Sequence, residues 1–114
     1  MIEECRFGSM TIEGRRFGTD LMIFPDGRIQ DGWRRAAGHR LCLADIDELV
    51  AAQPQVLVVG SGIFGRMKPA PDLEQLLNQK GIRMLMARTK AAAQLFNDTR
   101  MARTMVGGCF HLTC

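Results

Sequence analysis

The most constraining feature of this chain is a run of four apolar residues, Val56–Val59, that leads directly into Gly60-Ser61-Gly62. A strand made only of apolar residues is typical of a sheet that is covered on both faces. Glycine then lets the backbone leave the sheet in a tight turn. The pattern therefore favours an α/β fold in which this strand lies near the centre of its sheet.

Helical and extended patterns alternate on either side of that strand. Asp45 and Thr89 are the expected N-caps of two helices, and a third helix is expected between Pro71 and Gly81. Further strands are expected at 82–87 and 104–112. Strands that are separated by helices predict right-handed crossovers and a largely parallel central sheet.

The first third of the chain has the pattern of strands and turns instead. A strand is expected over 7–12, ended by Gly14, and a hairpin is expected from strands on either side of Pro25-Asp26-Gly27. Trp33, at the end of the hairpin's second strand, is its largest apolar side chain and should be buried. The hairpin must cover or extend one side of the central sheet.

Length and composition limit the fold and the function. The 114 residues suffice for a single α/β domain, residues 1–114, with one core, and 46% of them are hydrophobic. The net charge is only +3 and the basic residues are scattered, which argues against nucleic-acid binding. No apolar run is long enough to cross a membrane. The four cysteines form no CxxC pairs and no secretory signal begins the chain, so we expect a cytoplasmic protein with free thiols.

The loop at residues 60–65 has the spacing GxGxxG, which invites a dinucleotide-binding interpretation. That site needs a helix that opens directly on the glycines and an acidic residue about 20 positions later. Pro69 and Pro71 delay the next helix, and the following strand ends in Met86-Ala87-Arg88 without an acid. We therefore expect no nucleotide and no other cofactor.

Two interpretations of the glycine loop remain. The loop could bind a small anion or another small ligand through the backbone amides of Gly60, Ser61 and Gly62, together with Arg66 and Thr89. Alternatively, the glycines only allow a tight exit from the sheet, which is the interpretation that we favour.

No catalytic or metal site is expected elsewhere. The glycines flank Ser61 immediately, whereas a nucleophile elbow places them two residues away on each side. Cys109, His111 and Cys114 do not share one face of an extended strand, so they make a poor zinc site. His39 is a lone histidine in a polar loop. We therefore expect no enzymatic activity.

Several of these segments together resemble a small family of proteins. They are the strand with Gly60-Ser61-Gly62, the proline-led helix that ends at Gly81, Asn97 in the last helix, and the ending Val106-Gly107-Gly108-Cys109-Phe110-His111-Leu112-Thr113-Cys114. The family includes the adipogenesis-associated small protein of mammals, the mitochondrial respiratory complex I assembly factor 3 and many bacterial proteins of unknown function.

The resemblance covers most of the chain. It implies a three-layer α/β domain with a mixed central sheet whose last strand is antiparallel to its neighbours. It supplies no catalytic residues, and its best-understood branch is a non-enzymatic assembly factor. We therefore expect an accessory protein that binds another protein, with a small-anion or small-ligand domain as the alternative.

Overall fold

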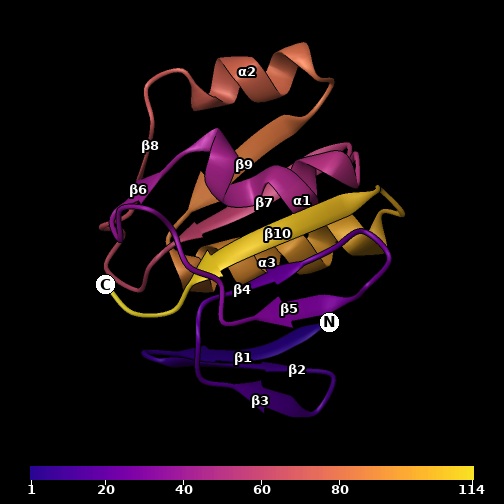
Figure 1. Cartoon of the computed structure of the whole chain (residues 1–114). Helices are drawn as coiled ribbons and strands as arrows, with labels where there is room; N and C mark the ends of the chain where they lie inside the picture. The colour runs from indigo at the N-terminus through magenta and orange to yellow at the C-terminus, as the bar shows by residue number, and fades with distance from the viewer.

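In the computed structural model, which describes residues 1–114, the apolar strand lies inside a five-stranded sheet (Figure 1). This strand, β7 (Val56–Ser61), is flanked by β9 (Arg83–Ala87) and β10 (Val106–His111), and both run parallel to it. The order β5-β4-β10-β7-β9 is completed by β4 (Leu21–Ile23) and β5 (Ile29–Asp31). The predicted position of the apolar strand is confirmed.

The direction of the last strand differs from the expectation. β10 is antiparallel only to β4, whereas it is parallel to β7. The physical reason is the connection: the chain passes from β9 through the single helix α3 (Thr89–Met101), and such a crossover returns it in the same direction. The sheet is therefore mixed, with a parallel half and an antiparallel half.

The sheet is the middle of three layers, as predicted. One face is covered by a 3₁₀ turn (Leu43–Ile46), α1 (Asp47–Ala51) and α2 (Leu73–Gln79). The other face is covered by α3 and by a small antiparallel sheet. A separate apolar core fills each side of the sheet. The neighbouring residues Leu57 and Val58 of β7 belong to opposite cores.

The small sheet consists of β1 (Ile2–Arg6), β2 (Ser9–Ile12) and β3 (Arg15–Phe17). The single strand predicted over 7–12 is therefore wrong in its start, because the chain turns at Phe7-Gly8. The sequence pattern does not predict β1, because three of its five residues are charged. It is an edge strand of its sheet, where charged side chains reach water.

The predicted hairpin is present, as β4 and β5 joined through Pro25-Asp26-Gly27. Trp33 is buried as expected, and its indole N–H donates a hydrogen bond to the Asp45 carbonyl over 2.9 Å. Asp45 does not have the predicted N-cap position. Its carboxylate accepts from the Cys42 amide at 2.9 Å, so the helical segment begins earlier, at Leu43.

Two short elements complete the fold. β6 (Arg40–Leu41) and β8 (Lys68–Pro69) pair in parallel beside the glycine loop. None of the helices combines the length and the apolarity needed to cross a bilayer, and the longest, α3, has 13 residues.

Candidate functional site at the carboxyl end of the central sheet

The glycine loop lies where the parallel strands end, beside the C-terminal residues of the chain (Figure 1). Gly60 and Ser61 still belong to β7, and Gly62 has a φ of +106° that favours glycine. A side-chain carbon at Gly60 would lie 2.9 Å from both the Phe110 ring and the Thr89 hydroxyl. The first glycine therefore permits close packing and the second permits the turn.

The amides of the loop already have partners within the chain. Gly62 donates to the Thr89 hydroxyl at 2.8 Å, Ile63 to the Thr113 carbonyl at 2.7 Å, and Arg66 to the Cys114 backbone oxygen at 2.9 Å. These backbone amides therefore donate to oxygens of the chain itself and not to an anion. A ligand at this loop stays a prediction.

Thr89 does not cap α3 as predicted. It is the first residue of the helix, and Arg88 has the N-cap position. Its fully buried hydroxyl donates to the His111 carbonyl at 2.6 Å while accepting from Gly62. Thr89 therefore ties the ends of β7, α3 and β10 together.

The other two predicted site residues lie apart from each other. The Ser61 hydroxyl is buried and donates to the Ala87 carbonyl at 3.2 Å; His111 is the register partner of Ser61 on β10, but their side chains form no hydrogen bond with each other. Arg66 is exposed, and its guanidinium forms no ion pair. The structure therefore places Gly60, Ser61, Gly62 and Thr89 together inside the fold and Arg66 on its surface.

A buried charged cluster, which the sequence did not reveal, lies next to this loop. Asp20 Oδ2 accepts from His111 Nδ1 at 2.7 Å and from the Arg35 guanidinium at 3.0 Å. Asp20 Oδ1 accepts from the Leu112 amide at 2.7 Å. The Arg35 and His111 side chains are only 5% and 7% exposed. Because each residue comes from a different part of the chain, no local spacing could have predicted the cluster.

Arg35 makes further contacts that fix its position, and its guanidinium also lies 3.1 Å from His111 Nδ1. Its Nε donates to the Gly38 carbonyl at 3.0 Å, and the guanidinium carbon lies 4.6 Å from the centre of a Trp33 ring. Arg35 Nη1 and His111 Nε2 are buried without a hydrogen-bond partner. The Arg35 and His111 side chains border neither of the two hollows in the surface, of which one lies between β1 and α3 and the other is lined by Ile12, Ile23, Arg100 and their neighbours. The cluster therefore holds the β4–β5 hairpin, the loop after β5 and the end of β10 together.

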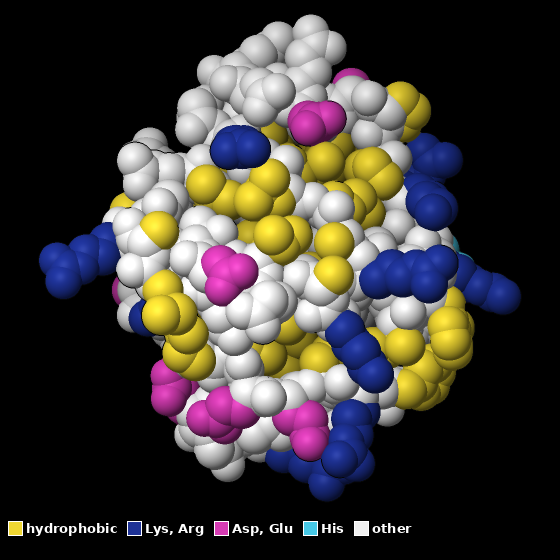
Figure 2. Space-filling model, turned by 180° about the vertical axis from the view of Figure 1, so that it is seen from behind, with side chains coloured by type: hydrophobic (Ala, Val, Ile, Leu, Met, Phe, Trp, Pro, Cys, Tyr) yellow, Lys and Arg dark blue, Asp and Glu magenta, His cyan; other side chains and the backbone are white.

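The surface outside this cluster is basic and aromatic. Phe7 and Phe64 are 56% and 60% exposed, and their ring centres are 5.8 Å apart. Four exposed cations lie at the same end of the sheet: Arg66 in the loop after β7, Lys68 in β8, Arg88 just after β9 and Lys90 in the first turn of α3. Figure 2 shows Lys and Arg side chains gathered on the right flank, beside hydrophobic ones and away from most acidic ones.

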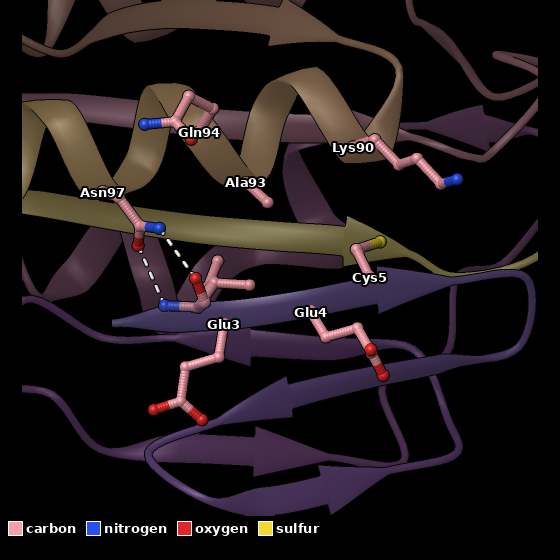
Figure 3. Close-up of a pocket in the computed structure, with 8 residues that line it drawn as sticks. Glu3, Glu4, Cys5, Lys90, Ala93, Gln94 and Asn97 are labelled. Atoms are coloured by element: carbon pink, nitrogen blue, oxygen red, sulfur yellow. Dashed lines mark hydrogen bonds between the residues drawn. The ribbon is translucent and has the colours of Figure 1, made fainter.

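The larger hollow, of about 320 Å³, lies between β1 and α3 (Figure 3). The Asn97 amide closes one end by accepting from the Ile2 amide at 2.9 Å and donating to the Ile2 carbonyl at 2.8 Å. Burial raises the pKa of the Cys5 thiol more than nearby Lys90 lowers it. The raised pKa favours the protonated thiol, which is a weak nucleophile.

The chain matches the family described as "Protein of unknown function (DUF498/DUF598)" over residues 2–111. It belongs to this family. Its fold is similar to that of the conserved hypothetical protein PH1505 from Pyrococcus horikoshii, with a TM-score of 0.87 and 28% identity over 100% of this chain and 99% of that one. MT938 matches with a TM-score of 0.85 and 25% identity over 100% and 98%.

A third similar structure is a protein from Bordetella pertussis that is described as a Mth938-like domain. Its TM-score is 0.69 and its identity is 18%, over 98% of this chain and 85% of that one. The predicted resemblance to a small family of unknown function is thus confirmed, as is the α/β fold with a mixed sheet. No specific activity comes with the family.

Proposed function

We propose that this member of the DUF498/DUF598 family is a non-enzymatic accessory protein that binds another protein along strand β9. The observation that carries the proposal is the open outer edge of β9. The resemblance to the adipogenesis-associated protein and to complex I assembly factor 3 supports an assembly-type role. We also place the protein in the cytoplasm, because its unpaired cysteines suit a reducing compartment.

β9 pairs with β7 on one side only. The Arg83 amide donates to Gln55, which faces that side. Because alternate residues of a strand face opposite edges, the amides and carbonyls of Met84 and Met86 face outward. These N–H and C=O groups can form hydrogen bonds with the backbone of an extended segment that adds to the sheet as a further strand.

The two edges of the central sheet differ in their protection. β5 has three residues, of which Gln30 and Asp31 are exposed and polar. β9 has five residues, and the four after Arg83 are apolar and half-buried. Short polar edges resist strand addition, whereas longer apolar edges accept it.

An apolar face adjoins this edge. Leu85 and Ala87 of β9 and Leu95 of α3 pack against the α3-side core but remain partly exposed. Figure 2, which views the molecule from behind, shows a band of hydrophobic side chains across the upper middle of the surface. A partner strand on β9 would cover part of this face as well as the edge.

The charges at the ends of β9 indicate the kind of partner. Arg83 begins the strand and Arg88 follows it, and both are exposed. Two copies of β9 paired antiparallel about Leu85 would set Arg83 opposite Ala87 and Arg88 opposite Ile82, so neither arginine would face an acidic residue. An extended segment with an apolar centre and acidic ends would pair with both arginines, so it fits better than a second copy.

The test is recovery of partners from native extract by the tagged full chain, compared with two matched variants. Leu85→Lys should abolish recovery of any partner that the wild-type chain retains at stoichiometric level, while Gln30→Lys on the opposite edge should retain it. Thermal melting of both variants checks the fold. Recovery of no stoichiometric partner, or equal recovery by folded Leu85→Lys, would overturn the proposal.

A further inference from the structure

We propose that the surface formed by Phe7, Phe64 and the four cations Arg66, Lys68, Arg88 and Lys90 docks onto an anionic membrane surface. We call this surface the aromatic tip. It lies at the carboxyl end of the sheet; it shares Arg88 with the charged end of β9 but includes no residue of that strand. The inference therefore does not depend on the protein-binding proposal.

The two phenylalanines protrude from two separate turns. Phe7 occupies the turn between β1 and β2, and Phe64 lies in the loop that follows β7. More than half of each side chain is exposed, although their rings lie 5.8 Å apart. Aromatic side chains that protrude beside basic ones are typical of segments that enter the headgroup region of a bilayer.

The backbone holds these two turns rigidly. The Gly8 amide donates to the Leu112 carbonyl at 2.8 Å, and the Ile63 amide donates to the Thr113 carbonyl at 2.7 Å. Both turns are thus tied to the same short segment after β10. Little conformational entropy would be lost in presenting both rings at once.

The cations around the rings have no acidic partner. The side chain of Lys68 donates to the Gly65 carbonyl at 3.0 Å, and that of Arg88 lies against Gly65, next to Phe64. Lys90 borders the same hollow as Cys5, which lies two residues before Phe7 in the chain; Glu3 and Glu4 border that hollow without pairing with Lys90. None of these cations, nor Arg66, forms an ion pair, whereas Arg6, next to Phe7 in the chain, pairs with Glu4 at 3.1 Å. Unpaired cations are attracted to anionic headgroups.

The shape of the tip favours a membrane over an acidic protein. Binding energy between proteins concentrates where anchors fill well-packed pockets. Of the residues of the tip only Lys90 borders one of the two hollows of this fold, and neither hollow includes Phe7 or Phe64. A bilayer needs no complementary pocket, only protruding apolar groups and positive charge.

The experiment is co-sedimentation of the full chain with vesicles. We expect binding to phosphatidylcholine vesicles that contain roughly one-third phosphatidylglycerol, release by high salt, and no binding to pure phosphatidylcholine. The pair Phe7→Ser and Phe64→Ser should weaken binding roughly tenfold or more. The triple variant Arg66→Glu, Lys68→Glu and Arg88→Glu should abolish it.

Matched controls come from the opposite end of the sheet. Lys80, Arg83 and Arg103 are exposed cations before or at the start of β9 and β10, and Met101 and Met105 are exposed apolar residues there. Reversing these three charges, or changing the two methionines to serine, should leave at least half of the vesicle binding. Leu85→Lys should bind vesicles like the wild-type chain, which separates this test from that of β9.

Three results would overturn the proposal. The first is absence of binding to the anionic vesicles, or binding that the tip variants and the controls lower equally. The second is tight binding to polyglutamate without binding to vesicles, which would indicate an acidic protein. The third is a rise in melting temperature with inorganic phosphate but no vesicle binding, which would indicate a soluble anion.

Discussion

The carboxyl end of the central sheet has an interior and an outer surface whose side chains make very different contacts. Inside, Gly62, Thr89 and His111 have short hydrogen bonds or close packing to neighbouring strands. Outside, Phe64 and Arg66, only a few residues away in the chain, contact little and pair with no acid. The difference separates two parts of one loop: its glycines build the fold, whereas its larger side chains stay exposed.

If this comparison holds, Asp20→Asn should have the largest effect on stability. The change removes the negative charge that compensates buried Arg35 while keeping the shape of the side chain. We expect a loss of about 3–5 kcal/mol in the free energy of unfolding, because an unpaired charge then stays buried. Urea denaturation measures it.

The control for Asp20→Asn is Asp31→Asn, which changes an exposed aspartate at the end of β5. It should alter stability by less than about 0.5 kcal/mol. Adding Arg35→Met to Asp20→Asn should recover part of the loss, since the uncompensated charge is then gone. Equal stability of the two asparagine variants would show that the cluster does not hold the fold together.

Gly62→Ala should have the next largest effect. The new methyl group would overlap the backbone of Cys114, and φ is +106° at this position. We expect a loss of about 2–4 kcal/mol, from left-handed strain and overpacking together. Gly18→Ala, where a methyl group meets nothing within 4 Å, is the matched control in thermal melting. A wild-type melting temperature for Gly62→Ala would contradict the close packing of the loop.

The interior should also respond to alkaline pH through Cys109. Burial raises the pKa of this thiol from 9.0 to about 12. Below pH 9 both the folded and the unfolded states keep the proton; above it, only the folded state does, so stability falls as pH rises. Between neutral pH and about pH 10.5 the free energy of unfolding of the wild-type chain should fall by about 2 kcal/mol more than that of Cys109→Ala. Urea denaturation of both proteins at each pH measures the difference. Parallel pH profiles of the two proteins would contradict this prediction.

The smallest effect is expected outside. Phe64→Ser and Arg66→Ala should each change the free energy of unfolding by less than about 0.5 kcal/mol, because both side chains are exposed. Chemical denaturation of Phe64→Ser and Arg66→Ala, with Gly62→Ala measured alongside for comparison, tests this directly. A loss of more than about 1 kcal/mol for either change would place that side chain in the structural part of the loop.

Much of the fold could be predicted from local patterns. The buried strand at Val56–Val59 and the hairpin at Pro25-Asp26-Gly27 follow from apolar runs and turn residues, and both are present. β1 could not be found in this way, because its charged residues carry no apolar alternation. The direction of β10 relative to β7 could not be found either, since the apolar pattern of a strand is the same in both directions.

The candidate site was less predictable than the fold. Sequence patterns grouped Gly60, Ser61, Gly62, Arg66 and Thr89 as ligand-binding residues. The hydroxyl of Thr89 and the Gly62 amide, however, bond to the chain itself. Asp20, Arg35 and His111 lie far apart in sequence, so only the folded chain identifies their cluster.

The sequence by itself determined that this is an α/β domain with a central strand, because the periods of helix and strand and the chemistry of turns are local properties. Only the tertiary structure decided what the glycine loop contacts. Its partners come from residues 111–114 and from Thr89, which lie far from it along the chain. Hydrogen bonds and ion pairs between distant segments depend on how the strands are ordered in space, and residue spacing contains no record of that order.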